Sequence, residues 1–317
     1  QLAAVAATGT EIVNRSFRYG LATVAVRPKQ LKPVARVPRV TSIREVLQPT
    51  LAGVGATARS AVRAAASACS PVKSEADSQL KNALAKTQFG VDGSGATVGI
   101  LSDSFGLTSS PTTVAQDIAS GNLPGPGNPC GRTTAVNVLE EYAPGDGDGA
   151  GTDEGRAMAQ LVHHAAPGAR IKFATAFNGE LGFADNIRAL ANAGSKIIVD
   201  DVAYFDEPMF QDGIVAQAIK DVTDDGVIYL TSAGNANVIL GGNDVSSLEV
   251  GSPTSGMPCP AVVNAYEGQP TACVEYSGSD IGAQYTVSNA KALAVNLQWN
   301  QPQNGVTTDY DLFILNG

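Results

Sequence analysis

The sequence lacks a long apolar stretch, has no paired cysteines of the zinc type and contains only two histidines. No run of about twenty apolar residues occurs, so no membrane-spanning helix is predicted. The four cysteines include no CxxC pair, and their spacings differ from those of zinc sites. A glycine loop of the phosphate-cradling kind is also missing. These absences predict a protein with no cofactor, no bound metal and no membrane partner.

Charge is scarce and unevenly distributed. Charged residues make up 16% of the chain, and the net charge is -9. Residues 1–70 nevertheless hold ten basic side chains, from Arg15 to Arg63, against Glu11 and Glu45 alone. The rest of the chain is therefore strongly acidic, which argues against nucleic acid as a partner. The spread-out charges of the basic arm are typical of a solvated segment, although they would also suit an anionic surface.

Composition divides the chain into three regions. Residues 1–88 read as a leader, pro-segment or linker because prolines interrupt them repeatedly. Those prolines are Pro28, Pro33, Pro38 and Pro49. Residues 89–250 alternate short apolar runs with helical patterns. Residues 251–317 carry strand patterns at 284–287, 293–299 and 310–315, which predict an inserted, incomplete β-sandwich-like domain.

The cysteines and the first residue bear on the compartment. Cys259 and Cys273 flank one loop-rich stretch and would close it as a disulfide, with free buried thiols as the alternative. The chain begins with Gln1 and not with Met, so we expect its natural start, with any signal peptide, to be missing. We therefore predict a secreted, extracellular protein.

The middle region has the pattern of a parallel α/β sheet. Short apolar runs are separated by helical patterns of about ten residues, an order typical of a parallel sheet with helices on both faces. The strands are expected at 97–101, 135–139, 170–174, 196–199 and 226–230. Sites in such sheets gather beyond the carboxyl ends of the strands. Asp103, Asp200, Asp201 and the segment 231–235 all follow predicted strands.

A glycine-rich loop at 144–150 leads into a helix that begins near Asp153 and Glu154 and stops at Pro167. Taken alone, the two acids read as an ordinary helix cap, since unpaired N–H groups and the helix dipole favour carboxylates there. Asp153 is assigned this capping role. Glu154 becomes a candidate for more when the neighbouring motifs are considered.

Four motifs in order resemble the subtilisin/sedolisin superfamily of serine peptidases. They are Val98-Gly99-Ile100-Leu101-Ser102-Asp103-Ser104, Glu154-Gly155-Arg156-Ala157-Met158-Ala159, Ala166-Pro167-Gly168-Ala169 and Thr231-Ser232-Ala233-Gly234-Asn235. The resemblance covers roughly residues 90–240. It implies a subtilisin-like α/β fold and a serine-type peptidase, a hydrolase acting on polypeptides.

Three positions depart from the family pattern. Glu154 stands where subtilisins place a histidine, and sedolisins place a glutamate. Sedolisins follow that glutamate by an aspartate one helical turn on, whereas Met158 stands there in this chain. Asn235 matches the oxyanion-hole residue of subtilisins. The chain thus resembles a sedolisin-like offshoot with mixed features, and Asp201 is a candidate for the missing second acid.

The resemblance assigns roles to these residues. Asp103 and Glu154 would activate the serine, and Asn235 would stabilise the oxyanion. A carboxylate pair works as a base in acid, where imidazole is protonated, so we predict an acidic pH optimum. Ser255 follows Asn235 too closely to be the nucleophile. We expect the catalytic serine to lie beyond Gly317, which would leave this chain inactive alone.

The histidines are poor candidates for catalysis. His163 and His164 lie nine and ten residues beyond Glu154, which is about 14 Å along a helix. We assign them structural or surface roles.

Two other interpretations stay open. The chain could be a catalytically inactive relative that acts as a binding or adhesion module. It could also be a different α/β enzyme, such as a phosphatase, in which Asp103, Asp200 and Asp201 hold a divalent cation. In the segment 200–208, Asp206 and Glu207 are expected to lie in a solvated loop or to cap a helix.

Overall fold

A computed structural model describes most of the chain. The described residues are 2–51, 69, 74–145, 149–234, 239–240, 243–244, 254–275, 280–282, 284 and 295–315. The chain divides into two compact units, Gln1–Gly234 and Asn235–Gly317. Each unit is described by itself.

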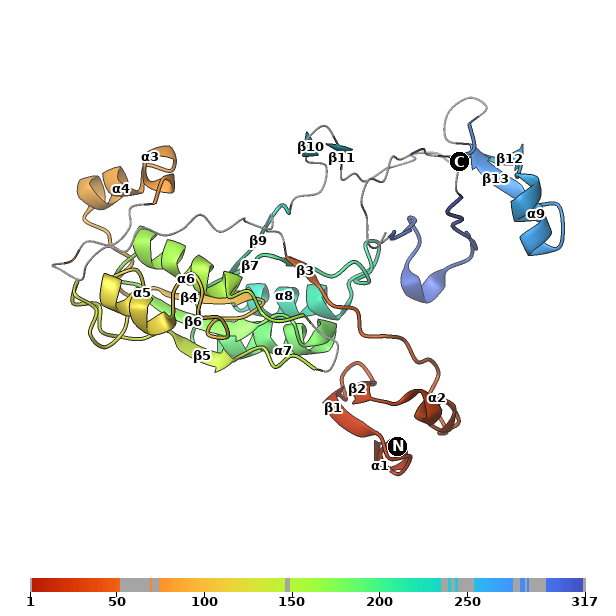
Figure 1. Ribbon diagram of the computed structural model, residues 1–317, viewed down its shortest axis with the longest axis horizontal. Helices are drawn as coiled ribbons and strands as arrows, with labels where there is room; N and C mark the ends of the chain where they lie inside the picture. Colours follow the sequence, from red (N-terminus) through yellow and green to blue (C-terminus); the bar gives the residue numbers. More distant parts are fainter. Residues whose placement is uncertain are drawn as a thin grey trace. The chain divides into compact units, whose positions relative to one another are not determined.

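A five-stranded parallel sheet forms the centre of the first unit (Figure 1). Its strand order is β5-β6-β4-β7-β9. The strands are β4 (Thr97–Ser102), β5 (Asn137–Glu140), β6 (Arg170–Thr175), β7 (Ile197–Asp200) and β9 (Ile228–Thr231). Register is continuous through the centre, where Leu101 of β4 pairs with Ala174 of β6 and with Asp200 of β7. All five strands overlap the segments predicted from the sequence.

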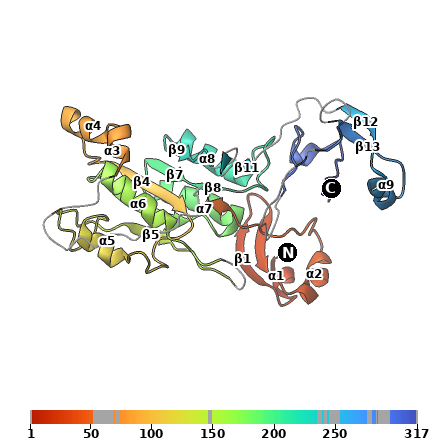
Figure 2. The same ribbon diagram turned by 45° about the horizontal axis from the view of Figure 1, so that its top comes forward.

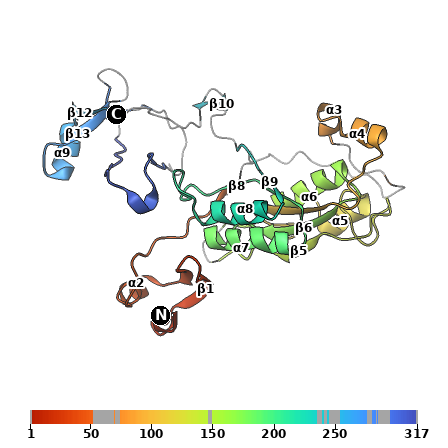
Figure 3. The same ribbon diagram turned by 180° about the vertical axis from the view of Figure 1, so that it is seen from behind.

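Helices cover both faces of this sheet. They are α5 (Val114–Ser120), α6 (Glu154–Ala165), α7 (Gly179–Asn192) and α8 (Ile214–Asp224). Ala159 of α6 packs with Ile100 and Phe173 in one cluster, whereas Leu101 and Ala174 pack with residues of α7 and α8 in another. Figure 3 shows α7 and α8 together on one side of the sheet. The predicted α/β architecture is therefore confirmed.

The described residues 2–40 form a small packed body. It consists of α1 (Leu2–Ala6), the antiparallel hairpin of β1 (Glu11–Ser16) and β2 (Leu21–Ala25), and α2 (Pro28–Ala35). Val5, Val34 and Val37 make its core. The prolines do not prevent this packing, since Pro28 opens α2 at a position where no N–H is needed. The assignment of this region as a pro-segment stays a prediction.

The remaining elements before β4 are the short strand β3 and two short helices. β3 (Thr50–Leu51) pairs antiparallel with β8 (Val202–Ala203), which follows β7 (Figure 2). The short helices α3 (Ala76–Gln79) and α4 (Asn82–Phe89) precede β4. A disulfide joins Cys69 to Cys130. Among the described residues, no helix has the length and apolar character needed to cross a membrane.

The second unit holds short elements around a second disulfide. They are β10 (Ile239–Leu240), β11 (Asn243–Asp244), β12 (Thr254–Pro258), α9 (Ala261–Glu267), β13 (Ala272–Glu275) and a 3-10 turn at Gln303–Gly305. β12 and β13 form an antiparallel hairpin. The Cys259–Cys273 disulfide bridges this stretch, so that predicted pairing is confirmed. Helix α9 is a finding that the strand-only prediction for this region missed.

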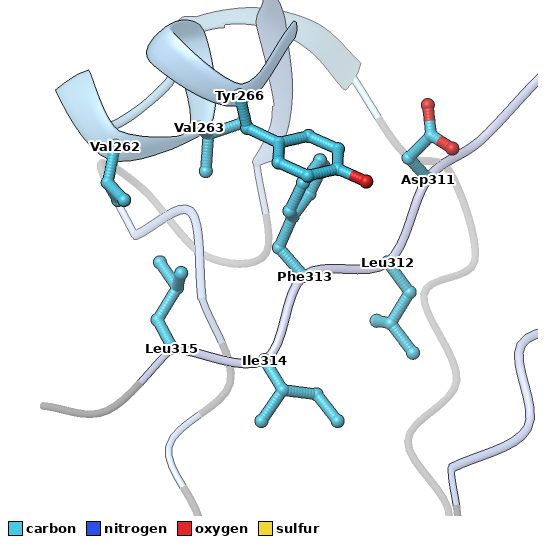
Figure 4. Close-up of a pocket in the computed structure, with 8 residues that line it drawn as sticks. All are labelled: Val262, Val263, Tyr266, Asp311, Leu312, Phe313, Ile314 and Leu315. Carbon is cyan, nitrogen blue, oxygen red and sulfur yellow. The ribbon is translucent and has the colours of Figure 1, made fainter.

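The strands predicted at 295–299 and 310–315 do not form within the described residues. Aromatic packing holds these segments instead, because Phe313 lies against Tyr266 of α9 and Trp299 lies against Tyr310. Figure 4 shows the residues from Phe313 to Leu315 beside the face of α9. The predicted strand at 284–287 falls mostly outside the described residues, and the β-sandwich-like domain stays a prediction.

Candidate active site

Three carboxyl groups meet at the carboxyl edge of the sheet. Asp103 follows the central strand β4, Asp201 follows the neighbouring strand β7, and Glu154 opens α6. β4 is the first strand of the sheet in chain order. The next two strands, β5 and β6, lie on one side of β4, and the following strand, β7, lies on its other side. The carboxyl end of β4 is therefore the topological switch point, where parallel sheets place their sites.

Asp103 is buried and fully hydrogen-bonded. One carboxylate oxygen accepts the backbone N–H groups of Ser104 and of Glu154, the latter at 2.9 Å. The other oxygen accepts the backbone N–H of Thr152 and, at 2.7 Å, its hydroxyl. Asp103 thus ties the start of α6 to the end of β4. It fixes where the Glu154 side chain begins.

Glu154 is half-buried, and its pKa is raised above the ordinary value. Burial is the main cause, and the Asp103 carboxylate adds to it. A contact with the Asp201 carboxyl works in the opposite direction. Glu154 therefore holds its proton at a higher pH than an exposed glutamate.

Asp201 is more strongly affected. It is buried, and burial raises its pKa to about 7, with further increases from the charges of Glu154 and Asp103. The nearby Ser102 hydroxyl opposes this effect. Neither carboxyl oxygen of Asp201 has a hydrogen-bond partner of good geometry among the described residues. Asp201 and Glu154 thus titrate as an interacting pair, in which the charge of Glu154 raises the pKa of Asp201.

The side chains of Asp200 and Asp201 are both buried, but they have different neighbours. Asp200 accepts the Thr231 hydroxyl at 2.8 Å and the Val202 N–H at 3.3 Å. Burial raises the pKa of Asp200 as well. Asp200 therefore ties β7 to β9, and Asp201 alone faces Glu154.

The predicted cap by the Asp153 side chain is wrong. Asp153 occupies the cap position, with φ of 60°, but its carboxylate makes no capping hydrogen bond to the helix. It accepts the backbone N–H groups of Leu107 and Thr108 and the hydroxyls of Ser104 and Thr108. The buried Arg156 lies 3.1 Å away on the next turn. The Asp153 carboxylate therefore holds the loop after β4 and not the first turn of α6.

The remaining candidates have structural contacts or lie outside the described part. His163 is buried, which lowers its pKa, and His164 lies 2.9 Å from Asp77 and so joins α6 to α3. Glu207 accepts the N–H groups of Val215 and Ala216 and so caps α8, which is one of the two roles expected for it. Asn235, the predicted oxyanion residue, lies outside the described residues.

The metal interpretation finds no support in the described residues, where no group of three or more His, Cys, Asp or Glu side chains is placed so that it could hold a metal ion. Both oxygens of Asp103 are already filled by N–H and O–H donors.

Sequence reasoning missed Ser102 and Arg156 as parts of the site. The Ser102 hydroxyl is fully buried beside Asp201. Arg156 pairs with Asp153 and, at 3.6 Å, with Asp117 of α5, and it donates to the Thr112 carbonyl at 2.8 Å. The helical pattern of this segment does not by itself mark Arg156 as buried.

No family model and no curated protein matches the chain. One similar solved structure is fervidolysin from Fervidobacterium pennivorans, titled a keratinolytic enzyme related to subtilisin, at 14% identity and a TM-score of 0.34. Another is MycP1 with its N-terminal propeptide removed, at 15% identity and a TM-score of 0.29.

The matches cover 74% and 63% of this chain. The chain spans only 38% and 57% of the two structures. The fold class is therefore defined by the five-stranded parallel sheet and the helices that cover it.

Proposed function

We propose that this chain carries the acid–base part of a secreted serine-type peptidase that hydrolyses polypeptides. The observation that carries the proposal is the convergence of Asp103, Glu154 and Asp201 at the switch point of the sheet. The proposed nucleophile is a serine hydroxyl. Two disulfides agree with an oxidising, extracellular compartment.

Each carboxyl group has a distinct role in this mechanism. Ionised Glu154 takes the proton of the serine hydroxyl as its oxygen bonds to the substrate carbonyl carbon. The same proton passes to the leaving amine when the peptide C–N bond breaks. Asp201 holds the second proton of the pair and orients Glu154, while Asp103 fixes the helix start. Asn235 is proposed to stabilise the oxyanion.

A polypeptide substrate would bind as an added strand. In this chain β3 already pairs with β8, directly after Asp201. Strand addition of this kind recognises an extended backbone and leaves the side chains to separate pockets. The pairing supports a polypeptide ligand at this edge.

The proposal is tested on the full-length protein that contains this chain, with a quenched fluorescent peptide library at pH 4 to 7. Replacing Glu154 with glutamine should reduce kcat/KM by about 10²–10⁴, the usual contribution of a positioned base. Glu11→Gln, on the exposed surface of β1, is the matched control and should leave kcat/KM unchanged. Full activity of Glu154→Gln would rule the proposal out.

A second candidate function is a binding module without catalysis. The β3–β8 pairing favours it specifically, since strand capture needs no nucleophile. Peptide binding with no turnover, and no labelling of the full-length protein by a fluorophosphonate, would select this alternative.

A further inference from the structure

A second group of acids lies apart from the three carboxyls of the candidate active site. Glu180 in the first turn of α7, Asp206 and Glu207 interact electrostatically with one another. Arg44, from the segment before β3, points its guanidinium at them, with Nη2 of Arg44 2.6 Å from Oε2 of Glu180. The Glu180 side chain is only 8% exposed, whereas that of Arg44 is 53% exposed. A half-exposed cation thus lies against the acidic pocket, which is formed by the buried Glu180 and the half-buried Asp206 and Glu207.

One arginine does not satisfy this pocket. Burial raises the pKa of Glu180 to about 7, and the charges of Asp206 and Glu207 add to the effect against the pull of Arg44. Oε1 of Glu180 and Oδ1 of Asp206 are buried with no hydrogen-bond partner among the described residues. A guanidinium offers five N–H donors, so these open acceptors fit a cation held more deeply than Arg44 is.

The pocket lies on the path of an extended polypeptide. Val46 rests on the backbone of Gly179, where an added Cβ would lie 2.7 Å from it. Six residues after Arg44, Thr50 pairs with Ala203, and Leu51 pairs with Val202 next to Asp201. Residues 44–51 therefore run from the start of α7 towards the candidate active site.

Backbone pairing and side-chain recognition are separated along this path. Pairing with β8 uses main-chain groups and accepts many sequences. The acidic pocket contacts a side chain and requires a positive charge, because buried acids without a counter-charge are costly.

We propose that Glu180, Asp206 and Glu207 form a subsite that selects an arginine or lysine side chain in the polypeptide ligand, about six residues before the residue that pairs with Ala203. This inference deepens the proposed function, and it rests on that function where the polypeptide ligand is taken to be a substrate. Arg44 of the chain itself occupies the subsite in the present structure.

The test uses two fluorescein-labelled peptides that copy residues 40–51, one with arginine at position 44 and one with citrulline. Citrulline keeps the shape and removes the charge. The protein is the full-length chain with Arg44→Gln, which empties the pocket of its resident cation. The arginine peptide should bind at least about tenfold more tightly than the citrulline peptide, as expected for a charge-assisted hydrogen bond.

Adding Glu180→Gln should bring the two affinities together, whereas the control Asp225→Asn, an exposed acid after α8, should leave the preference intact. Thermal unfolding of each variant verifies that it is folded. Equal binding of the two peptides to folded Arg44→Gln, or no binding of either, overturns the subsite.

Binding and cleavage are read separately. An arginine preference without turnover contradicts the peptidase proposal and keeps the subsite. Turnover of the peptide library without an arginine preference supports the peptidase proposal and contradicts the subsite.

Discussion

Glycine at position 155 allows α6 to approach the sheet. An added Cβ there would lie 2.3 Å from the Phe173 ring and 2.8 Å from the Ser104 carbonyl oxygen. Those contacts are too short for real atoms, so any side chain would push the helix away from β6. The position of Glu154 depends on this approach, since Glu154 is the preceding residue.

Gly155→Ala should therefore destabilise the protein by about 1–3 kcal/mol, the usual cost of overpacking a core. Urea unfolding measures this cost. Gly149→Ala is the matched control, because an added Cβ at Gly149 meets no atom within 4 Å. Equal midpoints for both variants would show that α6 does not need the close approach.

At the scale of the element, α5 and α6 are joined through Arg156. Its guanidinium lies between the carboxylates of Asp153 and Asp117, and all three side chains are buried. Burial raises the pKa of Asp117, with the charge of Arg156 opposing it. Removing the arginine would leave two buried carboxylates with no cation beside them.

Arg156→Met should cost about 3–5 kcal/mol of unfolding free energy, as for other broken buried ion pairs. Chemical denaturation compares it with Arg170→Met, which removes an exposed arginine at the start of β6. The account of this network fails if the two substitutions cost the same.

The elements of the sheet could be predicted because each has a strong local pattern. β4, β7 and β9 are short and mainly apolar, and the structure places all five strands within a few residues of the prediction. Asp103 and Glu154 follow from their places at the end of a strand and the start of a helix. These features depend on neighbours in the sequence.

Other features depend on contacts between distant residues. The pairing of Arg44 with Glu180 joins residues 136 apart, and nothing in the local sequence indicates it. The side-chain role of Asp153 depends on the loop at Leu107 and Thr108, so the local rule for helix caps gave the wrong answer. Helix α9 is only seven residues long, too short for a clear periodicity.

At the scale of the whole first unit, the basic arm and the acidic body are partners. Arg18 pairs with Asp221 of α8 at 2.6 Å, and Arg44 pairs with Glu180 of α7. Arg188 of α7 donates to the Tyr19 hydroxyl at 2.7 Å. The arm predicted to be solvated therefore uses part of its charge on the chain's own acidic surface.

The buried acids make stability depend on pH. The pKa of Asp201 and that of Glu180 are raised to about 7, so the folded protein binds more protons than the unfolded chain between about pH 4 and pH 7. The free energy of unfolding should therefore fall as pH rises through this window. Asp221 and Asp92, with pKa values lowered to about 2, lose their contribution only in stronger acid.

Asp201→Asn should flatten this decline, by about 2–4 kcal/mol between pH 4 and pH 8. Urea unfolding across that range, with Asp225→Asn as the exposed control, measures the difference. An unchanged slope in Asp201→Asn would mean that Asp201 titrates as an ordinary exposed acid.

The pH profile of kcat/KM for the full-length protein tests whether Glu154 and Asp201 act together as the catalytic pair. Glu154 must be ionised to act as the base, and the pair must keep one proton to hold Glu154 in place. Because burial raises the pKa of Glu154 and brings that of Asp201 to about 7, activity should peak below neutral pH and decline above it. A profile that peaks above neutral pH would contradict the assignment of Glu154 and Asp201 as the catalytic pair.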